Sequence, residues 1–500
     1  MKNNYFKAIG ELTPTIFKST YIIPLKHYFF KQNDKSMSVF KEFNKLNWHL
    51  ANNTAKEELF LYDIKSYLLD TFFPKILEIN GKNISQSYKS LYLKNTKFTQ
   101  LKLMIQKDNK QFKTDLQFDL YLDSIDLWIL DDNISLFAIH ISNQQDTNYT
   151  INEYSSIVNR VLRNYQTLYA YVEDETLLIS INKVDNNQIK LIDLLIDLTR
   201  LSDKKSFLNI DKQNYNDTII NQSTYYAKML TSIYVDKQDI KIDNNKINIV
   251  KNYDMLTEEV LVDFDYFDEI PYLLSTTSTF NFIEEPSFIS HKKYMYKNLE
   301  NSNINIWQNW VGIGLQDSCS FFSVKNGGAM IVNSNSTSNY FLYIMNIVTN
   351  IKLKIYEQEV IDDDFINVHK IYPLKRKLQK LKNQFIANEI SIKFQPSHIY
   401  NKMEKGLGNK EILDEISSNI DTTLDLTKQN TDTFISVGAI LFTAGSFWEP
   451  ISYGYKHNPT LTLSIMIGAI IGMITIIYKR NQIFKTVKNS IHWFNNKFNN

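Results

Sequence analysis

Apolar and polar positions alternate through much of the first 370 residues in the way expected of strands with covering helices. Residues 126–141 alternate around an Asp-Asp-Asn turn, and residues 240–250 do so around Asp243, so each stretch predicts a β-hairpin. Residues 151–168 carry apolar side chains every three or four positions, as an amphipathic helix does. We therefore expect a cytosolic α/β domain over residues 1–372, divided into two halves near 255–300.

The second half of this region resembles the first in pattern. Residues 315–324 can be laid over residues 130–139, and a helical pattern from 338 to 358 follows them. Chance similarity and a true duplication explain this equally well. Residues 341–351 are apolar, but they contain two asparagines and are followed by lysines. A buried core helix is therefore favoured over a membrane span.

After Pro373 the pattern becomes purely helical and predicts a long helical stalk over residues 373–432. Breaks are expected near residues 395–397 and 406–408. From Leu413 a stripe with steps of three and four continues to Leu441, the pattern of a helix that packs against copies of itself. In an oligomer the stripe would line a pore through Thr423, Thr427, Asn430, Phe434, Val437 and Leu441. A plain coiled coil without conduction is the alternative.

Carboxylates accompany this stripe. In a ring of subunits they would attract cations, and the candidates are Asp421, Asp425, Asp432 and Glu449. The alternative for each aspartate is a solvated acidic face.

Two uncharged segments near the C-terminus, residues 433–448 and 459–478, predict a transmembrane hairpin. Basic residues follow the second segment, and residues 479–500 form a basic amphipathic pattern. By the positive-inside rule both termini would be cytoplasmic. The sequence thus predicts a multi-pass protein of the cytoplasmic (inner) membrane, in contact with lipid.

Composition argues against several functions. The formal net charge of +1 gives no reason to expect direct nucleic-acid binding, and the one cysteine excludes an internal disulfide. No phosphate-binding loop, nucleophile elbow or zinc-protease motif is present, and the eight histidines are scattered. We therefore expect a protein that is not an enzyme, with no identified cofactor and no assignable metal ligands.

The layout from Pro373 to Arg480, a long helix entering one span and a short loop before a second span with basic residues after it, resembles the CorA-type divalent cation channel family. The resemblance implies a cytosolic α/β domain followed by long α-helices and a C-terminal two-helix transmembrane hairpin. The family's Gly-Met-Asn signature is absent, since the matching place reads Gly445-Ser-Phe-Trp-Glu-Pro450. No metal-binding residue is carried over.

CorA-like proteins without this signature also occur as membrane effectors of antiphage systems, including type III CRISPR. The resemblance therefore implies a homo-oligomeric channel that its cytosolic domain opens on binding a nucleotide second messenger. Arg160 and Arg163, close together on one predicted helix, are the candidate ligand contacts, because arginine suits phosphate. A divalent cation (Mg²⁺-type) transporter and a non-conducting membrane-anchored scaffold are the alternatives. Subunit number, permeant ion and activating ligand are left open.

Overall fold

The computed structural model describes residues 9–26, 47–66, 68–69, 77–79, 82–84, 90–96, 101–107, 116–130, 134–143, 149–155, 177–180, 188–190, 198, 228–236, 240–243, 246–253, 256–263, 268–276, 292–307, 309–324, 328–362, 368–383, 390–425 and 460. Packing divides the chain into a compact unit of residues 1–420 and a second unit of residues 421–500. The strands and labelled helices below all belong to the first unit.

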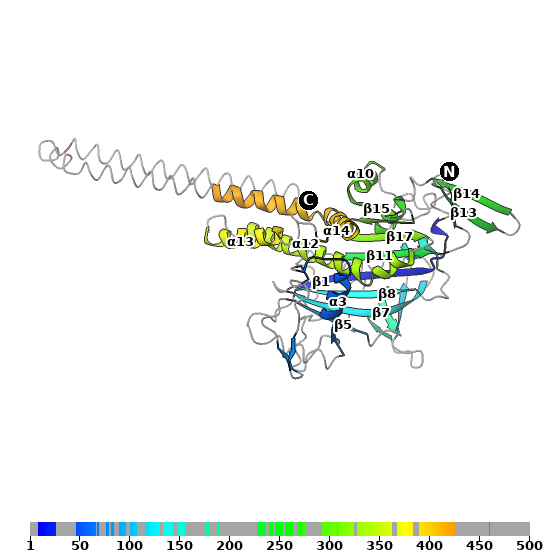
Figure 1. The fold of residues 1–500 in the computed structure, drawn as a ribbon, viewed down its shortest axis with the longest axis horizontal. Helices are drawn as coiled ribbons and strands as arrows, with labels where there is room; N and C mark the ends of the chain where they lie inside the picture. Colours follow the sequence, from blue (N-terminus) through cyan, green and yellow to red (C-terminus); the bar gives the residue numbers. More distant parts are fainter. Residues whose placement is uncertain are drawn as a thin grey trace. The chain divides into compact units, whose positions relative to one another are not determined.

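A mixed sheet of twelve described strands forms the centre of the first unit (Figure 1). Its order is β10-β9-β6-β7-β8-β1-β11-β17-β16-β15. Outside this order, β5 pairs with β7, and β2 pairs with β5. The bounds are β1 Ile16–Lys26, β2 His49–Leu50, β5 Ser90–Asn95, β6 Leu101–Lys107, β7 Leu116–Leu130, β8 Ile134–Ser142, β9 Leu177–Ser180, β10 Gln188–Lys190, β11 Lys228–Val235, β15 Asn303–Trp307, β16 Trp310–Gly314 and β17 Ser318–Val324. Among these pairings only β11 with β17 is parallel.

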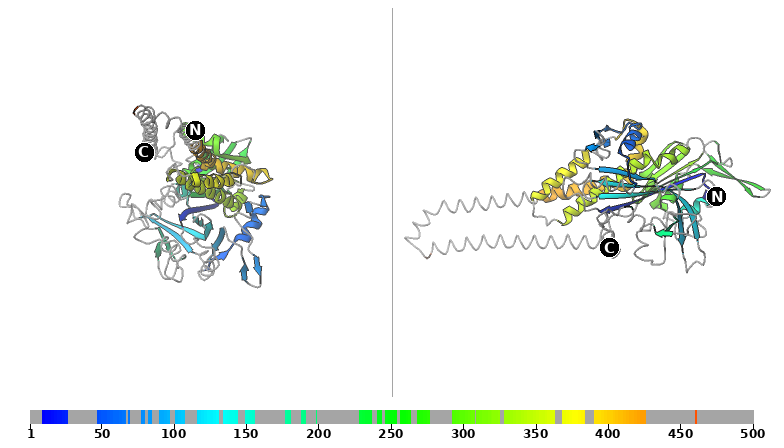
Figure 2. Two further views of the ribbon diagram at one scale, coloured as in Figure 1. Left: turned by 90° about the vertical axis from the view of Figure 1, so that its left-hand side faces the viewer. Right: turned by 90° about the horizontal axis from the view of Figure 1, so that it is seen from below.

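Two smaller sheets accompany the large one. The first consists of β12 (Ile240–Asp243), β13 (Lys246–Tyr253) and β14 (Leu256–Asp263), and it extends away from the large sheet (Figure 2). The second pairs β3 (Leu77–Ile79) with β4 (Lys82–Ile84).

Both predicted hairpins are confirmed. Strands β7 and β8 pair antiparallel on either side of residues 131–133, and β12 pairs antiparallel with β13 on either side of residues 244–245. The two predicted overlay segments become β8 and β17, which lie in the same sheet. Neither strand alternates in burial, since eight of nine positions of β8 and all of β17 are buried. A sheet covered on both faces has this property.

Described helices lie against both faces of the sheet. On one face lie α11, α12 and α14. Helix α11 contacts β1, β11 and β17, helix α14 contacts β16, and Phe341 of α12 contacts the Trp128 ring of β7. On the other face lies α9, whose Tyr272 packs with Ile313. The helix bounds are α3 Asn52–Phe60, α5 Ile151–Glu153, α9 Glu269–Ser275, α10 Lys292–Ser302, α11 Gly328–Ser334, α12 Ser338–Asp362, α13 Val368–Leu381 and α14 Phe394–Leu407. A further helix spans 409–425.

The helical stretch from α13 onward follows the sequence pattern in part, but residues 395–397, where a break is predicted, lie inside α14. Leu374, Leu378 and Leu381 of α13 are buried, as their spacing predicts. The helix begins at Val368, however, and so contains Pro373 in its first turns. The predicted break at 406–408 is confirmed, because α14 ends at Leu407 and Gly408 adopts a left-handed φ of 70°.

Helix α12 confirms the prediction of a buried core helix over residues 341–351. All eleven of these residues are buried, the polar Asn346, Thr349 and Asn350 among them. The side chains of these three polar residues hydrogen-bond to backbone carbonyl groups inside the protein. The run is therefore part of a protein core and not a lipid-facing surface.

The predicted CorA-like fold class, with its transmembrane hairpin, is wrong on the structure. Within the described ranges, no helix combines the length and the apolar character that crossing a bilayer requires. The descriptions as a membrane protein and ion channel, and the multi-pass location in the inner membrane, are corrected with it. The physical reason is that a span needs roughly 20 predominantly apolar residues, whereas even the 25-residue α12 is interrupted by buried asparagines. Apart from Thr460, the predicted spans 433–448 and 459–478 and the tail 479–500 lie outside the described residues.

Candidate functional site: a buried polar cluster beneath helix α12

Polar side chains from four neighbouring strands meet on the sheet face that α12 covers. Asp126 of β7 lies directly opposite Ala138 of β8, and His140, two residues further along β8, lies opposite Thr20 of β1. Side chains two residues apart on a strand point to the same face. Tyr92 of β5 and Tyr340 of α12 complete the group. We call these five residues, Thr20, Tyr92, Asp126, His140 and Tyr340, the buried polar cluster.

Hydrogen bonds connect the cluster around one carboxylate oxygen. Asp126 Oδ2 accepts a hydrogen bond from the Tyr92 hydroxyl at 2.8 Å and lies 2.9 Å from His140 Nε2. The other ring nitrogen of His140 lies 3.0 Å from Thr20 Oγ1. Since an ionised carboxylate only accepts hydrogen bonds, Nε2 carries a proton toward Asp126. The group therefore forms one continuous chain from β5 to β1.

Aromatic rings enclose this chain. The rings of Tyr92 and Trp128 stack at 4.3 Å, and the Tyr340 ring meets His140 edge-on at 4.7 Å. Trp128 Nε1 donates a hydrogen bond to the Tyr340 hydroxyl at 2.8 Å. Tyr340 thereby fixes the first turn of α12 over the cluster.

Burial and charge shift the proton affinities of the cluster. Burial alone would raise the pKa of Asp126, but the charge and hydrogen bond of His140, with Lys94 and Tyr92, outweigh it and lower that pKa. Burial, and then the charge of Asp126, hold the pKa values of Tyr92 and Tyr340 well above the usual tyrosine value. Asp126 is therefore an anion held among neutral phenols.

A more exposed rim of charged residues continues the cluster toward the surface. Lys18 Nζ donates to Asn333 Oδ1 at 3.2 Å, and Ser142 Oγ donates to Asp123 Oδ1 at 2.7 Å. Burial lowers the pKa of Lys18, partly offset by Asp123. Burial also raises the pKa of Asp123, which Ser142 and Lys18 partly offset. The rim holds two lysines, Lys18 and Lys94, close to these acids.

Several buried polar atoms at this face have no hydrogen-bond partner among the described residues. They are Asp126 Oδ1, Ser232 Oγ, both amide atoms of the Asn335 side chain, and Ser338 Oγ. Ser232 lies directly opposite Lys18 in the sheet. Asn335 belongs to the turn that joins α11 to α12, and Ser338 is the first residue of α12. Native proteins rarely leave buried polar atoms unsatisfied, so these atoms are candidate contacts for a polar molecule.

A carboxylate hydrogen-bonded to an imidazole, which is hydrogen-bonded in turn to a hydroxyl, also occurs in hydrolytic triads. The surroundings of Thr20, however, differ from those of a nucleophile. Thr20 is only 3% exposed and lies inside β1, which is paired on both sides by β8 and β11. Its neighbouring backbone N–H groups are therefore engaged in the sheet and do not face a developing oxyanion. Over the described ranges, no group of three potential metal ligands comes together either.

The predicted site residues lie elsewhere. Asp421 and Asp425 are exposed and Thr423 is buried, all on the 409–425 helix. The other predicted residues, Thr427, Asn430, Asp432, Phe434, Val437, Leu441 and Glu449, lie outside the described residues, as do Arg160 and Arg163. The earlier part of the stripe, Leu413, Ile416 and Ile420, is already buried in a single chain. This burial explains the stripe without a second copy, and self-association stays a prediction.

The sequence contained one signal for the cluster that local patterns did not use. Asp126 and His140 are polar residues inside otherwise apolar strands, a placement that is unfavourable unless the two side chains find partners. The partners themselves come from positions up to 120 residues away in the chain. Their meeting depends on the strand order and on no local spacing.

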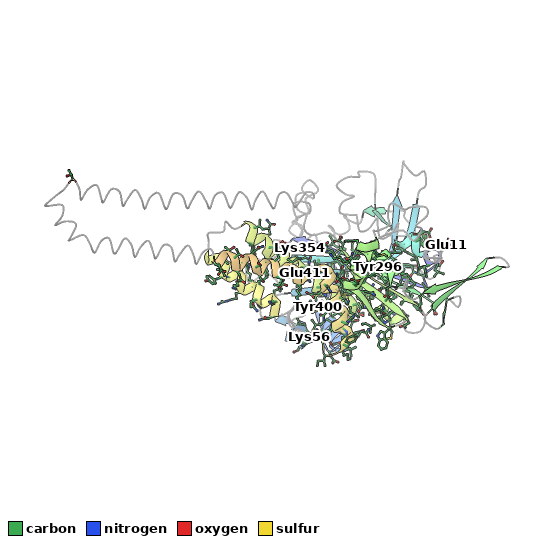
Figure 3. All side chains as sticks on the ribbon, turned by 90° about the horizontal axis from the view of Figure 1, so that it is seen from above. Glu11, Lys56, Tyr296, Lys354, Tyr400 and Glu411 are labelled. Carbon is green, nitrogen blue, oxygen red and sulfur yellow. The ribbon has the colours of Figure 1, made fainter. Side chains whose placement is uncertain are left out.

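Helix α12 also connects the cluster to the helices at the other end of the unit. Asn350 Nδ2 donates to Leu407 O at 3.1 Å and to Asn409 Oδ1 at 2.9 Å, and Asn409 Nδ2 donates to Asn346 O at 3.1 Å. These side-chain hydrogen bonds attach the turn around Gly408 to the middle of α12. Figure 3 shows Lys354, Tyr400 and Glu411 among the side chains of α12, α14 and the 409–425 helix.

Comparison with known proteins gives no relative: no protein-family model, curated protein or solved structure matches this chain.

Proposed function

We propose that this chain is a ligand-responsive regulatory protein in which a small polar ligand bound at the buried polar cluster alters the position of α12. The observation that carries the proposal is the double role of α12. Its Tyr340 closes over the cluster through Trp128, and its Asn350 holds the start of the 409–425 helix. A change at one end is thereby transmitted to the other.

The geometry of a helix supports such transmission. Tyr340 and Asn350 are separated by about 15 Å of helical rise, and a buried helix moves as a rigid unit over that length. The run from Phe341 to Ile351 is buried throughout, so a shift of the first turn of α12 displaces every core side chain of this run. Packed interfaces of this kind tend to switch between discrete arrangements.

The chemistry of the cluster suits a nucleotide second messenger. Lys18 and Lys94 supply positive charge for phosphate, and the unpartnered amide of Asn335 can pair with the edge of a base. An antiphage role belongs to the same proposal. We propose no catalytic step, because the imidazole and hydroxyl of the cluster are almost fully buried.

The test separates binding from its transmission. The full chain is titrated with a panel of cyclic mono-, di- and oligonucleotides, and with Mg²⁺ alone, while its melting temperature and amide exchange are recorded. We expect one nucleotide to raise the melting temperature and to change exchange in residues 409–420. Lys18→Gln should abolish both effects, and the exposed Lys410→Gln should change neither.

A second variant tests the role of α12. Asn350→Leu removes the bonds to Leu407 and Asn409 but leaves the cluster intact. It should keep the nucleotide-induced rise in melting temperature and lose the exchange response at 409–420. Failure of every nucleotide to bind, or binding that Lys18→Gln does not weaken, would contradict the proposal, and a response to Mg²⁺ alone would favour a divalent cation as the ligand.

A further inference from the structure

Large apolar side chains are exposed on three segments that hydrogen bonds connect, directly after α3, around the start of α14 and at the end of β15. Leu61 is 72% exposed, Ile392 86%, Phe394 69% and Trp307 55%. Single exposed apolar residues are normal, but a group of large ones marks an interaction surface. We call these four residues the apolar corner.

Hydrogen bonds hold the members of the apolar corner together. Lys393 Nζ donates to Leu61 O at 2.8 Å, so the residue between Ile392 and Phe394 contacts Leu61 directly. Trp307 Nε1 donates to Gln395 Oε1 at 3.3 Å, which brings Trp307 beside the start of α14. An isolated bridge between Ile64 and Ser391 ties the two backbone segments. These contacts lie within one chain, so the apolar corner needs no partner to form.

Positive charge adjoins the corner along α14. His398, Lys402 and Lys405 follow Phe394 at steps of four, four and three, which places them on one helix face. Burial and the charge of Lys402 lower the pKa of His398, and burial and the charge of Lys405 lower that of Lys402. Asp63, the acid beside the corner, is paired with Lys393 at 3.2 Å. Because the lowered pKa of His398 leaves its ring neutral near pH 7, the positive charge of this face comes from Lys402 and Lys405, and these two lysines favour a negatively charged partner.

The corner also lies at the end of an edge strand. β15 is the last strand of the sheet order, so no described strand pairs with its outer side, and Trp307 is its final residue. Edge strands pair readily with an extended peptide. Backbone groups of this kind recognise protein and offer nothing specific to lipid tails.

We propose that the apolar corner and the basic face of α14 bind a segment of a partner protein in which apolar side chains are flanked by carboxylates. The apolar side chains would cover Ile392, Phe394 and Trp307. The carboxylates would face Lys402 and Lys405. This surface does not depend on the ligand site, so either proposal can fail without the other.

Selection from a random peptide library tests this surface, since the partner need not be identified first. A display library of random 12-residue peptides is selected against the immobilised full chain, and the enriched peptides are synthesised for titration. We expect enrichment of peptides that combine Asp or Glu with Leu, Ile, Phe or Trp. Ile392→Ser with Phe394→Ser should weaken their binding at least tenfold, whereas Met330→Ser with Ile361→Ser, also exposed, should leave it unchanged.

A charge variant adds a second criterion. Lys405→Glu should weaken binding about fivefold, equivalent to about 1 kcal/mol, while Lys410→Glu should not. The absence of enrichment, the enrichment of neutral or basic peptides, or binding insensitive to Ile392 and Phe394 would overturn the proposal. So would self-association in sedimentation velocity that the Ile392 and Phe394 variant abolishes, or binding of anionic vesicles through the same residues, since these identify a second copy or a lipid surface as the occupant.

Discussion

The carboxylate of Asp126 is the most consequential single group in the described structure. It is fully buried. One of its oxygens accepts two hydrogen bonds, and the other accepts none among the described residues. Removing this buried charge leaves the donors of Tyr92 and His140 without their anionic acceptor, which is more damaging than removing an exposed pair.

Asp126→Asn should therefore destabilise the protein by about 3 kcal/mol. The amide keeps the volume and its oxygen can still accept from Tyr92 and His140, but the negative charge is lost and an N–H donor replaces Oδ1, which has no partner among the described residues. Urea denaturation measures the change, with Asp63→Asn as the control because the exposed Asp63–Lys393 pair is worth about 1 kcal/mol or less. An Asp126→Asn variant as stable as the wild type would show that the carboxyl group is not ionised in the folded protein.

Glu404 of α14 provides a pH-dependent test at the same scale. Burial, followed by the negative charge of Glu411, raises its pKa from 4.5 to about 7. The folded state thus holds this proton more tightly than the unfolded state, so the stability it contributes is present below pH 4.5 and is lost as the pH rises through 7.

We expect the unfolding free energy of the wild type to fall more between pH 5 and pH 8 than that of Glu404→Gln, which cannot titrate. Urea melts at the two pH values measure the difference, and Glu300→Gln, an exposed change on α10, should behave as the wild type. Equal pH dependence of the wild type and Glu404→Gln would show that Glu404 titrates normally.

At the scale of elements, the sequence pattern predicted what depends on local periodicity. The β7–β8 and β12–β13 hairpins, the core helix α12 and the break at Gly408 follow from spacing and turn residues. The polar cluster could not be predicted in this way, because Tyr92, Asp126, His140 and Thr20 meet only once the strand order places β5, β7, β8 and β1 side by side.

The close contact of α14 with β16 depends on two glycines, Gly406 and Gly314, which the periodicity of the sequence does not distinguish. A Cβ added at Gly406 would lie 2.1 Å from the backbone oxygen of Gly314, a contact that neither backbone can relieve by rotating a side chain. Gly408, by contrast, has open space but a positive φ of 70°.

Gly406→Ala should therefore lower the unfolding free energy by about 3 kcal/mol through overpacking, and Gly408→Ala by about 1 kcal/mol through backbone strain. Thermal and urea unfolding of the two variants measure the difference. If Gly406→Ala were the milder change, α14 would not be held as closely on β16 as the structure shows.

At the scale of the whole molecule, the boundary between the two units falls within the 409–425 helix. Residues 409–420 belong to the first unit, where the Asn350–Asn409 bonds attach them to α12. Leu413, Ile416 and Ile420 are buried at 1%, 1% and 2% exposure in the single chain. We infer that this segment completes the core of the first unit, in addition to continuing into the second.

Two truncations test this inference. A chain ending at residue 420 should unfold in one cooperative transition close to that of the full chain, because it retains the buried stripe. A chain ending at residue 408 loses three buried apolar side chains, each worth about 2 kcal/mol, and should melt at a much lower temperature and bind a hydrophobic dye. Should the two truncated chains be equally stable, the 409–420 segment would contribute nothing to the core. A segment that contributes nothing could not receive a signal from α12, so that result would also remove the transmission step from the proposed function.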